Sequence, residues 1–187
     1  MKLYFRGNFD GDYSQLPSRD PAPHHVKFKE ADNLEDFALK INILALGISG
    51  LALLLFSLHT GSLKNFHLNG SILALLTLVP HEFLHALCFR GPVYFYMKLT
   101  RGILFVTGTE TMTRGRAILT NLLPNLVFAF LPLALFLLNR DLHLLGSMAV
   151  FTLGMGAGDY YNVFNILSQM PKGAYTYMSG TSSYWFK

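Results

Sequence analysis

Apolar residues are gathered into four long blocks along the chain, and the charged residues lie mostly between them. The first block, residues 41–58, runs eighteen residues without a charge. As a helix rising 1.5 Å per residue it is about 27 Å long, close to the hydrocarbon thickness of a bilayer. The other blocks are 70–89, 117–138 and 142–158, and the last is expected to stay helical to about residue 170. This pattern predicts an all-α membrane protein built as a four-span helical bundle.

The polar segments between the blocks contain weaker signals. Residues 93–99 and 103–107 are rich in β-branched and aromatic side chains and flank Thr100-Arg101-Gly102, which predicts a short β-hairpin in the second loop. Residues 1–40 predict an irregular arm that ends in a short amphipathic helix near 32–40, capped by Asp32 or Asn33. The expected organisation is therefore an N-terminal arm (1–40), a four-span domain (41–170) and a cytosolic or interfacial tail (171–187).

The basic residues of these polar segments predict an orientation. They number six in the arm, one in the first loop, five in the second, one in the third and two in the tail. Because cytoplasmic loops carry the excess of Lys and Arg, the alternation places the arm, the second loop and the tail on the cytoplasmic side. We therefore expect a multi-pass protein of the cell membrane with both termini in the cytoplasm. The arm has no continuous apolar signal-peptide region, so the first span is expected to remain as an uncleaved anchor.

Composition narrows the function classes. Hydrophobic residues make up 51% of the chain and charged residues only 14%, against about 25% charged in ordinary globular proteins. The net charge of +4 is spread without a Lys/Arg cluster or a nucleic-acid motif, so we expect contact with anionic lipid headgroups and no nucleic-acid partner. The single cysteine, Cys88, excludes an internal disulfide framework.

The second apolar block contains the residues with the clearest chemistry. Directly after Pro80 comes His81-Glu82-Phe83-Leu84-His85, an H-E-x-x-H motif. Two histidines four residues apart project from one helix face, and each can offer a ring nitrogen to one Zn²⁺. Glu82 then lies beside the metal and can accept the proton of a bound water. Ionisable groups at membrane depth cost roughly 2.5–3.5 kcal/mol each, so three within five positions indicate a function rather than packing.

Such a site needs a third protein ligand and one open position. Three carboxylates follow the motif. Asp141 is expected on the opposite side of the membrane, and Glu110 stays a candidate in the polar part of the cytoplasmic loop. Asp159 ends the fourth apolar block at a depth close to that of His81, so we expect Asp159 to complete the site. Asn162, one helical turn further on, would orient Asp159 from a second layer of contacts.

Two glycines before Asp159 support this choice. Gly154 and Gly158 have the small-xxx-small spacing that allows helices to approach closely. A short aspartate side chain needs such an approach to reach a metal held by another helix.

In these motifs the chain resembles the DUF3267 zincin peptidases, and it is more distantly similar to the intramembrane metallopeptidases of the site-2-protease type. The resemblance rests on His81-Glu82-x-x-His85 and Gly158-Asp159-x-x-Asn162 and covers most of the chain. It implies zinc ligation by His81, His85 and Asp159, with Glu82 as the base. Site-2 proteases carry their aspartate in an Asn-Pro/Asp-Gly context, whereas residues 121–125 here contain no aspartate.

The hypothesis is a zinc-dependent intramembrane metallopeptidase, which hydrolyses a peptide bond through a zinc-bound water and the Glu82 base. Its expected partners are the lipid bilayer and a membrane-associated protein or peptide substrate. The first alternative is a catalytically inactive adaptor or sensor that binds metal in the membrane. The second is a transporter with His81, Glu82 and Asp159 along a cation route, which four spans without an internal repeat disfavour.

Overall fold

The computed structural model describes residues 1–30, 34–98 and 103–187. The chain divides into two compact units. The first comprises Met1–Glu30, Glu82–Asn121 and Asn162–Lys187, and the second comprises Ala31–His81 and Leu122–Tyr161. Within its described residues the second unit is built of helices, whereas the first contains two β-sheets.

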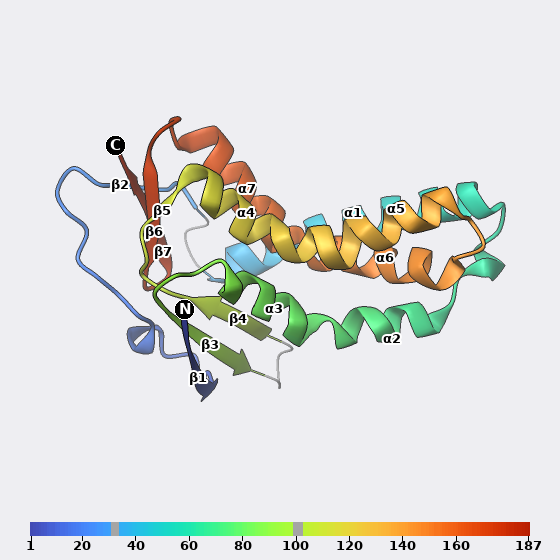
Figure 1. The fold of residues 1–187 in the computed structure, drawn as a ribbon, viewed down its shortest axis with the longest axis horizontal. Helices are drawn as coiled ribbons and strands as arrows, with labels where there is room; N and C mark the ends of the chain where they lie inside the picture. The colour runs from blue at the N-terminus through green and yellow to red at the C-terminus, as the bar shows by residue number, and fades with distance from the viewer. Residues whose placement is uncertain (31–33, 99–102) are drawn as a thin grey trace. The chain divides into compact units, whose positions relative to one another are not determined.

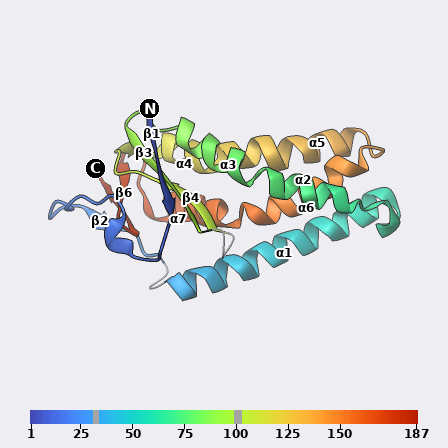
Figure 2. The same cartoon turned by 90° about the horizontal axis from the view of Figure 1, so that it is seen from below.

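The helices of the second unit are arranged around α6. They are α1 (Leu34–Thr60), α2 (Leu68–Leu76), the π-helical turn η4 (Leu126–Phe130), α5 (Leu131–Leu138) and α6 (His143–Met155), with a short 3₁₀ turn η2 at Leu63–Asn65. Helix α6 packs against α1, α2 and α5, and Figures 1 and 2 show these helices running side by side.

Small residues allow this close packing. A Cβ at Gly70 of α2 would lie 2.6 Å from Ser147 Cβ and 2.7 Å from Met148 N, so α2 and α6 are too close for a side chain there. A Cβ at Gly154 of α6 would lie 2.0 Å from Ser49 Oγ of α1. A close helix approach at Gly154 is therefore confirmed, but the helix that it meets is α1 and not the helix of the H-E-x-x-H motif. The same prediction is wrong for Gly158, where a Cβ would meet nothing within 4 Å.

Three helical segments of the described chain are long and apolar enough to cross a membrane: Asp36–Thr60, Leu68–Leu87 and Arg114–Leu138. They correspond to the first three predicted blocks. Helix α6, with 13 residues, belongs to the shorter apolar helices, and at about 20 Å it is shorter than a hydrocarbon core. Several leucines of α1 are exposed, among them Leu46 (74%) and Leu58 (70%). Such an exposed apolar surface suits lipid rather than water.

The first unit contains both β-sheets. One has three strands in the order β1–β3–β4, with β1 at Lys2–Asn8, β3 at Pro92–Lys98 and β4 at Ile103–Thr107. The other has four strands in the order β2–β7–β6–β5, with β2 at Val26–Lys27, β7 at Ser182–Phe186, β6 at Tyr175–Ser179 and β5 at Met112–Thr113. All neighbouring strands are antiparallel except β1 and β3, which are parallel. The fold is thus mostly helical with two sheets, and the all-α prediction was wrong in this respect.

The polar ends of the chain differ most from expectation. The arm predicted to be irregular supplies β1, β2 and the 3₁₀ turn η1 (Tyr13–Gln15), and the tail forms the β6–β7 hairpin. The arm strands β1 and β2 pair with β3 and β7, partners far away in sequence that a local pattern does not encode. Strands β6 and β7, in contrast, pair with each other across a short turn between Ser179 and Ser182. The short helix near 32–40 is not separate, because α1 runs without interruption from Leu34.

The predicted pairing of residues 93–99 with 103–107 is confirmed for the described strands, since β3 and β4 are antiparallel with Tyr94 opposite Thr107. Two details of the prediction, the turn at Thr100-Arg101-Gly102 and the cap at Asp32 or Asn33, lie outside the described residues.

A hydrophobic core in the first unit holds the ends of three helices. These are α3 (Leu78–Leu87), α4 (Arg114–Asn125) and α7 (Ala157–Gln169). The core buries nine side chains: Phe28, Ala86, Phe89, Val93, Met112, Ala117, Ile166, Met170 and Ala174. Ala86, Ala117 and Ile166 come from α3, α4 and α7 respectively, so this cluster packs together the parts of the three helices that belong to the first unit.

The close approach of α2 to α6 gives a first prediction. Gly70→Ala would force the backbone of the two helices apart, and we expect it to lower the free energy of unfolding by about 1–3 kcal/mol. Thermal unfolding in detergent micelles measures this effect. Gly50→Ala on α1 is the matched control, because a Cβ there meets nothing within 4 Å and alanine favours the helix by up to about 1 kcal/mol. Equal destabilisation by both substitutions would contradict the packing described here.

Candidate metal centre

The H-E-x-x-H motif lies on α3, which begins directly after a break from α2 at Thr77. The Thr77 hydroxyl donates to the Ala74 carbonyl at 2.6 Å, and the His81 N–H donates to the Thr77 carbonyl at 2.7 Å. Pro80 stands in the first turn of α3, where its missing N–H costs no intrahelical bond. The helix is therefore regular from its start through the motif, which keeps the two histidines on one face.

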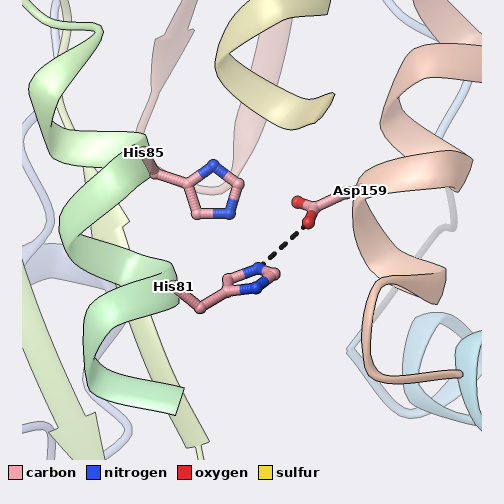
Figure 3. A group of neighbouring side chains, drawn as sticks. All are labelled: His81, His85 and Asp159. Carbon is pink, nitrogen blue, oxygen red and sulfur yellow. Dashed lines mark hydrogen bonds and ion pairs between the residues drawn. The ribbon is translucent and has the colours of Figure 1, made fainter. Parts of the chain in front are cut away.

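His81 and His85 point from α3 toward Asp159 on α7, as Figure 3 shows. One ligand atom from each of the three side chains lies within 4.8 Å of the others. His81 Nε2 and Asp159 Oδ2 are 3.1 Å apart, and both of these side chains are only 13% exposed. His85 is buried, and Glu82 is half-buried beside His81. The structure thus brings together the three residues predicted to bind metal.

The position of Asp159 follows from the junction between α6 and α7. Gly156 ends α6, and α7 starts at Ala157, so Asp159 falls in the first turn of α7. A carboxylate is stabilised there by the positive end of the helix dipole.

The protonation of His85 fits a metal ligand. Its Nδ1 lies 2.7 Å from the backbone carbonyl oxygen of Thr120, on α4. Because a carbonyl oxygen can only accept, Nδ1 donates this hydrogen bond, and Nε2 is the nitrogen left to bind a metal when the ring is neutral. Metal-binding histidines commonly have their second ring nitrogen held in this way. Two imidazoles and one carboxylate are also a usual donor set for catalytic zinc, so the residues present fit this ion.

Sequence reasoning missed Asn125, the last residue of α4. Its side-chain amide donates to Asp159 Oδ2 at 2.7 Å, and the side chain is 1% exposed. Asn162, expected to orient Asp159, donates instead from its amide to Asn121 Oδ1 at 3.1 Å. A signal for Asn125 was present in the sequence, because a polar side chain inside the third apolar block needs a polar partner.

Glu110 and Asp141, the other carboxylates considered, are not in the metal-binding group found among the described residues. Glu110 accepts hydrogen bonds from the backbone N–H groups of Arg90 (2.7 Å) and Gly91 (2.8 Å) and forms an ion pair with Arg116. The Arg116 Nε also donates to the Cys88 carbonyl at 3.0 Å. Glu110 therefore ties the chain that follows α3 to the first turn of α4.

Comparison with known proteins gives a family for this chain. The model of DUF3267, described as "Putative zincin peptidase", matches residues 74–175. This is more than half of the chain, and it includes His81, Glu82, His85 and Asp159. No curated protein and no solved structure matches.

The environment of Glu110 predicts a pH-dependent contribution to stability. Burial raises the pKa of Glu110, but hydrogen bonds from the Gly91 N–H, the Arg116 side chain and the Arg90 N–H outweigh it and hold the pKa below its ordinary value of 4.5. A carboxylate with a lowered folded-state pKa stabilises the protein above the unfolded pKa, and this contribution is lost as the pH falls through the folded pKa. Glu110→Gln is therefore expected to cost about 1–3 kcal/mol at pH 7 and progressively less below about pH 4.5.

Thermal unfolding of wild type and Glu110→Gln between pH 7 and pH 3 checks this. Asp141→Asn serves as the control, since Asp141 is exposed in the loop before α6 and its change should stay within about 0.5 kcal/mol. A Glu110→Gln deficit that is constant over the whole range would be inconsistent with a charge-dependent tie.

Proposed function

The chain belongs to the DUF3267 family of zincin peptidases, and from this premise we propose that it is a zinc-dependent intramembrane metallopeptidase. Its substrate would be a membrane-associated protein or peptide, in which it hydrolyses a peptide bond. The observation that carries the proposal is the convergence of His81, His85 and Asp159, whose ligand atoms lie within 4.8 Å of one another.

His81, His85 and Asp159 would hold the zinc ion. Three protein ligands leave a tetrahedral ion one open position, which is the arrangement of catalytic rather than structural zinc sites. Bound there, zinc would polarise the peptide carbonyl and make a water molecule acidic enough to attack it near neutral pH. The burial of His85 supports this role, because a shielded imidazole does not exchange its partner for bulk water.

Glu82 would be the general base. It follows His81 directly on α3, about 100° around the helix from it, and is half-buried. A carboxylate there can accept a proton from the attacking water and return it to the leaving amine. Positioned proton transfer of this kind contributes roughly 10²–10⁴ in rate.

The apolar helices support a substrate in or at the bilayer. Three helical segments have the length and composition of membrane spans. In our proposal α6 and α7, which follow each other across Gly156, together supply a fourth crossing, and both termini are cytoplasmic. The alternation of basic residues along the chain supports this topology.

An extended peptide needs a place to dock. Strand β4 ends the order of its three-stranded sheet, so one side of it has no neighbouring strand among the described residues. A substrate could add there as a further strand, with main-chain hydrogen bonds that do not depend on its sequence.

Metal analysis tests the ligand set. We expect about one zinc per chain in the purified wild-type protein, and loss of stoichiometric zinc in His81→Ala, His85→Ala and Asp159→Ala after dialysis against a chelator. His143→Ala is the control, because this histidine stacks on His67 and is not in the metal-binding group. Zinc-free wild type, or full zinc in His85→Ala, would exclude the site.

Glu82→Gln tests the reaction. The change preserves the shape of the side chain but removes the base, so we expect zinc to be retained within about twofold and cleavage to fall at least 10²-fold. Proteoliposomes of each variant are incubated with solubilised membrane proteins, and newly formed N-termini are labelled and counted. Zinc without cleavage in the wild type as well would favour the adaptor or sensor. Undiminished cleavage by Glu82→Gln would remove Glu82 as the base.

A further inference from the structure

Two neighbouring residues near the end of α4, Pro124 and Asn125, each affect a different candidate ligand. Pro124 lies inside the helix, and Asn125 is its last residue. The π-helical turn η4 begins at the next position, Leu126. Irregular helical turns of this kind often occur at functional sites.

Pro124 acts on the partner of His85. In a regular α-helix the N–H of residue 124 donates to the carbonyl of residue 120. Proline has no N–H, so it cannot make this bond to Thr120. The Thr120 carbonyl oxygen is the group that accepts the hydrogen bond from His85 Nδ1, at an N···O distance of 2.7 Å. Proline at this position therefore removes a competitor for the oxygen that sets the tautomer of His85.

Asn125 acts on Asp159 directly. Its amide donates to Asp159 Oδ2 at 2.7 Å, and the same oxygen lies 3.1 Å from His81 Nε2. A hydrogen bond from a rigidly held amide restricts the rotation of the carboxylate. The Asn125 side chain is 1% exposed, so packing leaves it little freedom of its own.

Gly156 provides the space that Asn125 occupies. A Cβ at Gly156 would lie 1.8 Å from Asn125 Oδ1 and 2.8 Å from the Tyr160 hydroxyl. The backbone of Gly156 has φ −74° and ψ 1°, a conformation open to other residues, so glycine is not required for the turn itself. Glycine is required at position 156 because the Asn125 side-chain amide occupies the space that a Cβ would need.

We propose that Pro124 and Asn125 form a positioning pair that orients two of the three zinc ligands, His85 through the Thr120 carbonyl and Asp159 through the Asn125 amide. The inference rests on the proposed zinc site. The pair does not contact substrate; it sets the directions of the ligands before the ion binds, and this lowers the reorganisation that binding requires.

Pro124→Ala gives the most specific test. Alanine restores the N–H at position 124 and improves the helix, which offsets the packing lost from the fully buried Pro124 ring, so the melting temperature of the metal-free protein should change little. The restored N–H competes with His85 for the Thr120 carbonyl, so zinc affinity should fall about tenfold. If Pro124 had only a structural role, the substitution would lower zinc affinity only together with the melting temperature. Pro132→Ala, at the start of α5 in the same candidate span, is the matched control and should leave zinc affinity unchanged.

Asn125→Ala and Gly156→Ala test the second half of the pair. Each is expected to weaken zinc binding about 10–100-fold, measured by competition with a chromophoric chelator on the purified full-length protein. The double variant should be no weaker than Asn125→Ala, because the added methyl group of Gly156→Ala then has no amide to displace. The control is Asn165→Ala, which removes a different buried asparagine, on α7. This variant should bind zinc with wild-type affinity.

The outcomes separate this inference from the function on which it rests. If wild type binds no zinc, or if His85→Ala binds it equally well, the zinc site itself is wrong. If wild type binds zinc through His85 but Pro124→Ala and Asn125→Ala bind it with wild-type affinity, only the positioning pair is overturned. Should Asn125→Ala fail to fold, Pro124→Ala decides the question, since it is not expected to destabilise the protein.

Discussion

Polar side chains inside an apolar helical protein are stable only when other polar groups meet them, and this constraint determines the geometry of the candidate metal centre. His81, Asp159 and Asn125 form one chain of hydrogen bonds, and His85 is held by the Thr120 carbonyl. Each contact offsets the desolvation of a group that would otherwise be costly to bury. The same hydrogen bonds determine which ring nitrogens of the histidines and which oxygen of Asp159 face one another. The stability of the buried groups and the geometry of the candidate ligands therefore have a common cause.

Both ends of α3 are held independently of any metal. The His81 N–H bonds to the Thr77 carbonyl at the start of the helix. Beyond the end of α3, the Glu110 carboxylate accepts hydrogen bonds from the backbone N–H groups of Arg90 and Gly91. Ala86 and Phe89 add a hydrophobic anchor next to the motif. A helix restrained in this way presents two imidazoles at a constant spacing, which a zinc site requires within a fraction of an ångström.

Departures from regular helix lie beside the ligands. Pro124 lies four residues after Thr120 within α4, and η4 begins where α4 ends. The break between α6 and α7 at Gly156 comes three residues before Asp159. In a regular helix each interior carbonyl already accepts an N–H from four residues further on, so a side chain must share that oxygen. Irregular positions release such groups, at a cost in local stability, and natural proteins concentrate this cost where a site benefits from it.

Local rules of the sequence were enough to predict the helical blocks, the β3–β4 pairing and the H-E-x-x-H face of α3, because these depend on residues a few positions apart. Asp159 could be chosen from the sequence because only three carboxylates follow the motif. Contacts between distant segments decided the rest: the parallel pairing of β1 with β3, the sheet that joins β2 to the tail, and the Asn125 amide on Asp159, 34 residues away. No periodic pattern records such pairs. They arise when the folded chain selects a partner for each buried polar group.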